Sequence, residues 1–326
     1  MNFAIIGAGL SSLSLASFLK DYGQVTIFEK SRGLGGRIAT RYHKDFNFDH
    51  GAQFFTVKSA TFKQFLEPSI RNESLKIWPA RFIEIKNGQY SNQKVWNKDF
   101  PHYVGVPNMN SFLKNKSNHH DIKLETNIKK IKKVADKWNV FDQDNNEYGF
   151  FDWVFVTAPY QQTKNLIEEH TTFSEQVSFI KMKGCFTLMI EMDHFNDLGW
   201  DAALVRDKNI SWISVNSSKP GRGSAKTMVI HSTNDWADTN MNLEKKAALR
   251  FLLNELDTIL PGICNNIRFA DIHRWRYANV DKQNGQNSYL DPNSKIGACG
   301  DWFIKGRVES GFSSAEHLFN NLKTLL

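Results

Sequence analysis

The chain has 326 residues, a length that suggests about two domains and is enough to bury a sizeable core. Its hydrophobic content of 41% and charged content of 23% are ordinary for a soluble globular protein. The net charge of +7 favours an anionic small-molecule partner, whereas the basic residues are too scattered to predict a nucleic-acid surface.

The first 29 residues follow the pattern of a dinucleotide-binding βαβ unit. Residues 3–6 and 25–28 are apolar runs of strand character, and residues 10–19 between them carry roughly helical spacing. Gly7 and Gly9 lie in the turn between the first strand and the helix, and Glu29 ends the second strand. This order of strand, glycine turn, helix, strand and acidic residue predicts a Rossmann-type start.

Each motif position of this unit has a physical role. Gly7 permits the tight turn, and Gly9 lets the backbone approach a pyrophosphate, whose charge the N–H groups of the helix start would hold. Glu29, 20 residues after Gly9, is placed to accept hydrogen bonds from an adenosine ribose. Ser12 stands where the pattern has its third glycine, and serine is small enough for close helix–strand packing.

A second loop rich in glycine and arginine follows at residues 30–37. A nicotinamide dehydrogenase has no need of such a loop, whereas flavoproteins of the amine-oxidase type have one. Arg32 and Arg37 would reach phosphate oxygens there, and the glycines let the backbone lie close to the cofactor. The segment 49–55, Asp-His-Gly-Ala-Gln-Phe-Phe, resembles the stretch that those enzymes lay along the isoalloxazine ring. Together these pieces indicate FAD.

The rest of the chain alternates between helical and strand patterns. Helices are expected at 59–70, from 109–113, at 161–169, at 243–260, and from about 308 to the C-terminus. Strands are expected at 78–85, 122–124, 128–134, 137–142, 148–156, 185–192, 202–205, 211–215, 227–231, 269–277 and 295–300, with a loop at 100–108. The short connections between 185 and 231 predict an antiparallel sheet inserted into the cofactor domain.

The cysteines and histidines indicate neither a disulfide framework nor a metal site. Cys185, Cys264 and Cys299 are odd in number and far apart, which favours a reducing cytoplasmic location. No stretch is long enough to span a bilayer, and the uncharged residues 1–19 fit a turn and a helix better than a signal peptide. A structural role is expected for Cys185.

With these pieces placed, the chain resembles the bacterial renalase family, a branch of the flavin amine-oxidase superfamily. The resemblance covers nearly the whole length and rests on the runs at 29–37, 51–55, 103–107, 218–222, 273–278 and 300–302. The early runs belong to the superfamily, whereas Ser-Lys-Pro-Gly-Arg at 218–222 and His-Arg-Trp-Arg-Tyr-Ala at 273–278 are more specific to this branch. Ser12, and Phe186 where the family often has tryptophan, depart from the pattern.

The resemblance implies an α/β fold, with a Rossmann-type FAD-binding domain and an inserted antiparallel-sheet substrate domain. The FAD-binding domain is expected at 1–60, 104–165 and 281–326, and the substrate domain at 61–103 and 166–280. Family members hold FAD without a covalent bond. They oxidise NAD(P) isomers that carry the hydride at ring position 2 or 6, return NAD(P)+, and pass the electrons to O2 to give H2O2.

The expected cofactor contacts combine the motifs with the resemblance. They are Gly7, Gly9, Leu10, Ser11, Ser12, Glu29, Lys30, Arg32, Gly36, Arg37, Gln53, Phe54, Ile128, Asp301, Val308 and Glu309. Asp301 would bind a ribityl hydroxyl or act only as a helix-entry carboxylate, and Ile128 would hold adenine through its backbone. The helix after Arg307 would direct its positive end at the flavin N1 and C2=O.

The strand from His273 is the expected substrate wall. Period-two alternation places His273, Trp275 and Tyr277 on one face, where they would stack on a nicotinamide ring, or simply form a packed aromatic strand backed by exposed arginines. Residues 219–222 belong to the substrate site or only to a hairpin turn. Hydride transfer to flavin N5 needs no strong base, so the catalytic residues remain unknown.

Two other functions remain open at this point. An FAD-dependent amine oxidase acting on a small amine shares every cofactor motif, and a non-catalytic flavin-binding protein shares most of them. The expected partners are a small dinucleotide substrate and O2, with no nucleic acid, membrane or metal. The sequence leaves open the oligomeric state, the preferred isomer and the choice between NAD and NADP forms.

Overall fold

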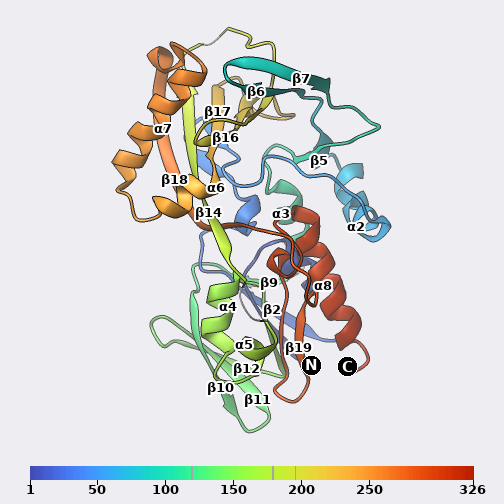
Figure 1. The fold of residues 1–326 in the computed structure, drawn as a ribbon. Coiled ribbons are helices and arrows are strands. Elements are labelled where there is room, and N and C mark those ends of the chain that lie inside the picture. The colour runs from blue at the N-terminus through green and yellow to red at the C-terminus, as the bar shows by residue number, and fades with distance from the viewer. Residues whose placement is uncertain (119, 178–179, 195) are drawn as a thin grey trace. The chain divides into compact units, whose positions relative to one another are not determined.

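A computed structural model describes residues 1–118, 120–177, 180–194 and 196–326 (Figure 1). By their packing, these residues form two compact units. Unit 1 comprises Met1–Arg37, Leu113–Met182 and Val280–Leu326, and unit 2 comprises Ile38–Phe112 and Lys183–Asn279. Three segments lie outside the expected domain bounds. Residues 38–60 and 104–112, expected in the FAD-binding domain, pack in unit 2, and residues 166–182, expected in the substrate domain, pack in unit 1.

Unit 1 is built on a six-stranded sheet of order β19-β20-β13-β1-β2-β9. Its strands are β1 (Asn2–Ile6), β2 (Gln24–Phe28), β9 (Asp121–Lys123), β13 (Trp153–Val156), β19 (Tyr289–Asp291) and β20 (Ile296–Ala298). All neighbours are parallel except β19 and β20. The apolar runs of β1 and β13 are buried, as expected for central strands of a parallel sheet that is covered on both faces.

Helices cover this sheet and bring distant parts of the chain together. They are α1 (Leu10–Leu19), α4 (Tyr160–Ile167), α5 (Phe173–Gln176) and α8 (Val308–Leu322), and α3 (Ser111–Ser117) crosses between the units. The Phe18 ring of α1 packs against the rings of Phe312 and Phe319 in α8. The first and last helices of the chain are therefore neighbours in unit 1.

A second, three-stranded sheet in unit 1 consists of β10 (Ile128–Val134), β11 (Lys137–Asp142) and β12 (Glu147–Phe151). In β10, Ile128 and Ile131 are buried while the lysines between them are exposed, the arrangement of a solvated strand face. The single strand predicted over 148–156 is wrong. The chain leaves β12 at Asp152 and enters β13 in the six-stranded sheet, because consecutive apolar residues hide a change of partner.

Unit 2 is built on a seven-stranded sheet of order β18-β14-β17-β16-β15-β6-β7. Its strands are β6 (Arg81–Lys86), β7 (Gln89–Val95), β14 (Met182–Met192), β15 (Ala202–Val205), β16 (Ile210–Val215), β17 (Lys226–Ser232) and β18 (Ile267–Val280). The ladders β14–β17–β16–β15 and β6–β7 are antiparallel, and β15–β6 is parallel. The predicted α/β fold class, a Rossmann-type sheet with an inserted antiparallel sheet, is confirmed.

The helix α7 (Lys245–Ile259) buries its apolar side against this sheet, beside β14 and β18 in Figure 1. Ala248, Leu252 and Leu256 from the helix join Ile213 and Ile230 from the strands in one core. The helix ends before Pro261, and Gly262 takes a left-handed conformation with φ of +82°. The predicted helix at 243–260 is therefore confirmed within a few residues, and the left-handed glycine follows its end.

Short elements account for most differences from the expected pattern. Strands β3 (Arg41–His43) and β4 (Phe46–Phe48) form a hairpin, and β5 (Leu75–Ile77) pairs with β8 (Tyr103–Gly105) inside the stretch expected to be a loop. The helices α2 (Ala60–Arg71) and α6 (Asn234–Thr239) complete unit 2. The sequence pattern indicated neither α6 nor these strands, because three to six residues are too few to show a period.

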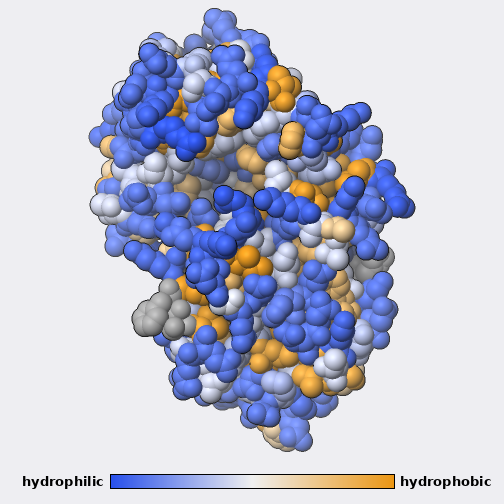
Figure 2. All heavy atoms as spheres, turned by 45° about the vertical axis from the view of Figure 1, so that its right-hand side comes forward, coloured by the Kyte–Doolittle hydropathy of each residue, from blue (hydrophilic) through white to orange (hydrophobic). Residues whose placement is uncertain are grey.

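The face drawn in Figure 2 is mostly hydrophilic, and its hydrophobic residues form small scattered groups. None of the helices in the described part of the chain has the length and apolar character that crossing a membrane requires.

Candidate functional site

The first glycine turn of unit 1 requires glycine at position 7. Gly7 has a φ of +104°, and a Cβ atom built there would lie 2.6 Å from Thr157 Oγ1. Its N–H donates to the carbonyl of Phe28 at 2.8 Å, which ties the turn to the end of β2. Both the conformation and the lack of space exclude a larger residue.

Gly9 leaves open space at the start of α1. It is the N-cap residue and has no side chain, and a Cβ atom added to it would meet nothing within 4 Å. The first helical hydrogen bond runs from Leu13 N–H to the Gly9 carbonyl at 3.1 Å. The N–H groups of residues 10–12 therefore have no helical acceptor, and they lie at the positive end of the helix dipole.

The loop at 30–37 folds back onto this turn. Gly35 N–H donates to the carbonyl of Ala8 at 2.9 Å, and a Cβ atom on Gly36 would lie 3.6 Å from Gly9 Cα. The two glycine segments that the sequence singled out are thus adjacent in space. We call Gly7, Gly9, Gly35 and Gly36, with the first turn of α1, the glycine cradle.

Glu29 lies at the edge of the glycine cradle and is 7% exposed. Its Oε2 accepts from Ala8 N–H at 2.9 Å, and its Oε1 accepts from Ser31 N–H at 2.8 Å. Each carboxylate oxygen keeps a second acceptor site for a hydroxyl. The free N–H groups at the start of α1 can therefore donate to a phosphate, and the carboxylate of Glu29 can accept from a ribose hydroxyl. A dinucleotide presents a phosphate and a ribose in this order.

The basic residues of the second loop differ in their partners. Arg32 is exposed and forms no hydrogen bond or ion pair with the described residues, so its guanidinium is free for a phosphate. Lys30 donates to Gln162 Oε1 at 3.1 Å. Arg37 forms an ion pair with Asp301, with Nη1 2.9 Å from Oδ2 and a second contact from Nη2 to Oδ1. Their direct contacts with a cofactor stay predictions.

The start of α8 lies beside the start of α1. A Cβ atom on Gly311 would lie 3.0 Å from Ser11 Oγ, and the N-cap residue Arg307 makes no side-chain capping hydrogen bond. Val308 and Glu309 occupy the first turn of α8. Two helix N-termini therefore meet beside the glycine cradle, which adds to the positive potential there. Ile128, the expected adenine contact, is buried at the start of β10.

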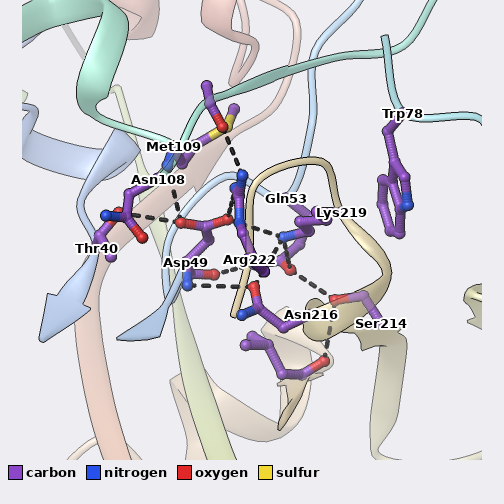
Figure 3. Close-up of polar contacts among 12 residues, drawn as sticks. Thr40, Asp49, Gln53, Trp78, Asn108, Met109, Ser214, Asn216, Lys219 and Arg222 are labelled. Atoms are coloured by element: carbon purple, nitrogen blue, oxygen red, sulfur yellow. Dashed lines mark hydrogen bonds and ion pairs between the residues drawn. The ribbon is translucent and has the colours of Figure 1, made fainter. Parts of the chain in front are cut away.

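In unit 2 the segment that follows β4 is held by a buried carboxylate (Figure 3). Asp49, which is 1% exposed, receives hydrogen bonds from Met109 N–H at 2.9 Å and Thr40 Oγ1 at 3.0 Å. Lys219 Nζ lies 3.3 Å from its Oδ2, and Arg222 contacts the same oxygen. Both cations are almost fully buried.

Gln53 connects this carboxylate to the sheet. Its Oε1 accepts from Ser214 Oγ at 2.6 Å and from Lys219 Nζ at 3.0 Å. Its Nε2 donates to the carbonyl of Gly51 at 2.9 Å and lies 3.4 Å from His231 Nε2. We call Asp49, Gln53, Lys219 and Arg222, with Asn216 beside them, the Asp49 network.

The pKa values in the Asp49 network reflect burial opposed by pairing. Burial raises the pKa of Asp49, but Lys219 and Arg222 outweigh it and lower the pKa to about 2. Burial lowers the pKa of Lys219 to about 8, although Asp49 opposes this change. Burial and the Lys219 charge lower the pKa of His231 to about 4. Two cations thus face one carboxylate in the interior of unit 2.

His273 and Trp275 of β18 lie against each other, and a residue from another segment joins them. The His50 ring stacks on Trp275 with centroids 5.1 Å apart, and His273 meets Trp275 edge-on at 4.3 Å. Trp275 Nε1 donates to the His50 carbonyl at 2.9 Å. We call His50, His273 and Trp275 the Trp275 wall. Tyr277 lies two residues further along the same strand.

The alternative of a strand backed by exposed arginines holds only in part. Arg276 is exposed, but the Arg274 guanidinium lies 5.2 Å from the centroid of the Phe186 ring and donates to the Leu243 carbonyl. The Phe186 ring therefore packs against the Arg274 guanidinium, at a position where the renalase family that the sequence resembles often has tryptophan. Phe54, an expected cofactor contact, lies among the rings of Trp96, His102 and Trp212.

Both imidazoles of the Trp275 wall are neutral at physiological pH. Burial lowers the pKa of His50 to about 3, and His273 and Arg41 add to the effect. Burial and the charge of Arg41 lower the pKa of His273 to about 4. Within the described ranges, no three His, Cys, Asp or Glu side chains meet in a way that could hold a metal.

Sequence reasoning missed three groups of this region. Asp49 and Lys219 stood in quoted runs, but nothing in either run indicated that the two pair across 170 residues. His50 stood in the quoted run 49–55 without a role of its own, and Arg41 was not singled out. The sequence did contain a carboxylate, Asp49, in one quoted run and two basic residues, Lys219 and Arg222, in another. Their opposite charges were the only indication that the two runs pair.

Comparison with known proteins supports the fold of both units. A family model described as an NAD(P)-binding Rossmann-like domain matches residues 5–68. A protein provisionally described as a protoporphyrinogen oxidase, from Exiguobacterium sp. 255-15, is similar with a TM-score of 0.78 and 11% identity, over 100% of this chain and 99% of that one.

Two further structures are similar over nearly their full lengths. An oxidoreductase from Methanosarcina mazei gives a TM-score of 0.70 at 14% identity, over 98% of this chain and 100% of that one. Wild-type putrescine oxidase bound to putrescine gives 0.70 at 11% identity, over 99% of each chain. At such identities the likeness shows that the chains share a fold.

Proposed function

We propose that this chain binds FAD without a covalent bond and oxidises the 2- and 6-dihydro isomers of NAD(P), returning NAD(P)+. FAD, when bound, supplies the hydride acceptor and passes the electrons to O2, which gives H2O2. The observation that carries the cofactor assignment is the glycine cradle. Two glycine segments, a free helix N-terminus and a half-satisfied Glu29 meet there in one place.

In this proposal, different residues of unit 1 bind different parts of FAD. The N–H groups of Leu10, Ser11 and Ser12 bind the pyrophosphate, and Glu29 binds the adenosine ribose. Lys30, Arg32, Gly36 and Arg37 line the phosphates, and Ile128 holds the adenine. Asp301, Val308 and Glu309 would lie against the ribityl chain and the ring. Gln53 and Phe54 stay flavin contacts expected from the sequence motif alone.

The charges around the Trp275 wall favour a dihydronicotinamide over an amine. A free carboxylate would favour an alkylammonium substrate, but the nearby acids are already paired: Asp49 with Lys219 and Arg222, and Asp271 with Lys245. The Arg41 guanidinium beside His273 would repel an ammonium group. Imidazoles with pKa values of about 3 and 4 are weak bases, which suits a reaction that requires no proton abstraction.

Amine oxidation remains the second candidate, because the fold is shared with putrescine oxidase. Rapid mixing of the oxidised holoenzyme with 2- and 6-dihydro-NAD(P), ordinary 4-dihydro NADH and a panel of amines that includes putrescine separates the two. We expect fast flavin bleaching with the two isomers and slow bleaching with 4-dihydro NADH. Fast reduction by an amine, with none by either isomer, would move the assignment to amine oxidase.

The compartment is a further part of the proposal. All three cysteines are free, two of them buried. A cytoplasmic location stays a prediction from the cysteine pattern.

A further inference from the structure

Arg41 brings an unbalanced positive charge to the Trp275 wall. It lies at the first position of β3, and its Nη2 is 3.2 Å from His273 Nδ1. This is the one hydrogen bond of the Arg41 side chain with the described residues, and its Nε is buried without a partner. A buried guanidinium N–H with no acceptor is costly unless a ligand supplies one.

The Arg41 contact also fixes the tautomer of His273. A guanidinium can only donate, so His273 Nδ1 accepts and the ring proton lies on Nε2. The described residues offer no hydrogen-bond acceptor to this Nε2–H. Arg41 Nε–H is thus a buried donor without an acceptor, and His273 carries a further N–H donor at Nε2. In addition, the Nδ1 of His50 is buried without a partner.

No carboxylate of the described chain forms an ion pair with Arg41. Burial raises the pKa of Asp271, but Lys245 and, after it, Arg41 lower this pKa. Asp271, on β18 two residues before His273, is 2.6 Å from Lys245 Nζ. Asp49, next to His50, is paired with Lys219 and Arg222. The groups that face Arg41 from β18 and from the segment after β4 are therefore neutral or already paired. A ligand that binds here brings its own negative charge.

We propose that Arg41 and His273 bind the substrate phosphate nearest the nicotinamide, while Trp275 contacts the nicotinamide ring. The inference rests on the proposed function, since it takes the substrate to be a nicotinamide nucleotide. His273 separates Arg41 from Trp275 by one imidazole ring, so a ligand anion at Arg41 lies one sugar-sized step from a ring at Trp275. Arg41 is then the residue that distinguishes a phosphorylated dihydronicotinamide from a bare one.

The test compares substrates that share the reacting ring and differ in phosphate. Flavin reduction is followed by rapid mixing with the 2- or 6-dihydro isomers of NAD, of nicotinamide mononucleotide and of N-methylnicotinamide, which has no phosphate. The variants are Arg41→Gln, Arg41→Lys and His273→Phe. Arg276→Gln is the matched control, because it removes one positive charge from an exposed position of β18. FAD content and melting temperature verify that each variant folds.

Loss of a charge-assisted hydrogen bond predicts that Arg41→Gln raises the dissociation constant for both phosphorylated substrates by about tenfold to a hundredfold. The N-methyl compound should change by less than about twofold. Arg41→Lys should recover part of the loss, His273→Phe should lose less than Arg41→Gln, and Arg276→Gln should match the wild type. Equal losses on all three substrates, or no loss on any, would overturn the phosphate assignment.

Binding of NAD+ to the oxidised enzyme, measured by calorimetry, separates this inference from the proposed reaction. If no isomer reduces the flavin but Arg41→Gln weakens NAD+ binding while Arg276→Gln does not, the reaction is wrong and the phosphate site stands. If the isomers reduce the flavin and Arg41→Gln binds NAD+ and substrate normally, the reaction stands and the phosphate site is wrong. A wild type that binds no NAD+ also overturns the site.

Discussion

The glycine cradle of unit 1 and the Asp49 network of unit 2 hold their segments by opposite means. The cradle relies on backbone groups and on missing side chains: Gly9 leaves open space, and Gly7 sits where a Cβ atom would strike Thr157. The Asp49 network relies on buried side-chain charges, with two cations on one carboxylate. Adding a side-chain atom should therefore disturb the cradle, whereas removing a charge or changing the pH should destabilise the Asp49 network.

The largest effect is expected where the network loses its only carboxylate. Asp49→Ala leaves Lys219 and Arg222 buried without a counter-charge, which should lower the free energy of unfolding by about 3–5 kcal/mol. Urea unfolding measures this change. Asp197→Ala is the control, because it breaks the exposed ion pair with Arg81 and should change stability little. Similar losses in the two variants would show that burial does not distinguish the pairs.

Acid should weaken unit 2 through His231. Its pKa is about 4 in the folded protein, and an unfolded histidine binds its proton near pH 6.5. The unfolded chain therefore takes up the proton first, and stability falls as the pH drops from about 6.5 to 4, by about 3 kcal/mol from this residue. Asp49 adds a further loss as the pH falls from about 4 towards 2. His50 and His273, with pKa values of about 3 and 4, lower stability over the same range. His231→Gln should therefore reduce the slope of unfolding free energy against pH without removing it, and an unchanged slope would contradict the assignment.

Charges at the edge of the cradle should affect the cofactor more than the fold. Glu29→Ala and Arg32→Ala each remove a charge-assisted hydrogen bond to FAD in the proposed complex, worth about 1.5–3 kcal/mol. The FAD dissociation constant should rise about tenfold to a hundredfold. Titration of the apoprotein with FAD measures it, with Lys132→Ala on the exposed face of β10 as a control. Unchanged affinity in both variants would remove these contacts.

A pair of glycine variants tests whether the cradle depends on open space. Gly7→Ala should lower stability by about 1–3 kcal/mol, because its φ of +104° and the close Thr157 side chain both oppose a Cβ atom. Gly9→Ala meets no atom within 4 Å, so the apoprotein should remain as stable while FAD affinity falls. Thermal unfolding of the apoprotein and FAD titration give the two readouts. Tight FAD binding by Gly9→Ala would show that the cofactor does not approach this atom.

The smallest change is expected at the Trp275 wall, which consists of packed neutral rings. Trp275→Ala removes the surface that would position the nicotinamide, so flavin reduction should slow by about tenfold while FAD stays bound. Trp275→Phe keeps a ring and should recover part of the rate. Rapid mixing with the dihydro isomers measures both. Normal kinetics in Trp275→Ala would exclude the wall but leave the cofactor assignment unaffected.

The same contrast explains what was predictable from the sequence. Gly7, Gly9 and Glu29 lie within 23 consecutive positions, so their spacing alone predicts the turn, the helix start and the acceptor. The alternation of His273 and Trp275 on β18 was predictable for the same reason. The pairing of Asp49 with Lys219 spans 170 residues and leaves no local period, and Arg41 and His50 reach the Trp275 wall only through tertiary packing. The break between β12 and β13 was hidden because both strands are apolar.

Unit 1 consists of three separate chain segments, and this determines when it can finish folding. Strand β20 and helix α8, which complete its sheet and press Gly311 against Ser11, lie in the segment Val280–Leu326. During synthesis the glycine turn emerges first and must wait for almost the entire chain, including all of unit 2, before these partners exist. Such long-range closure makes folding slow relative to a protein of local contacts. Unit 2 is therefore expected to assemble before β20 and α8 join the glycine cradle in unit 1, so that cofactor capture comes at the end of biogenesis.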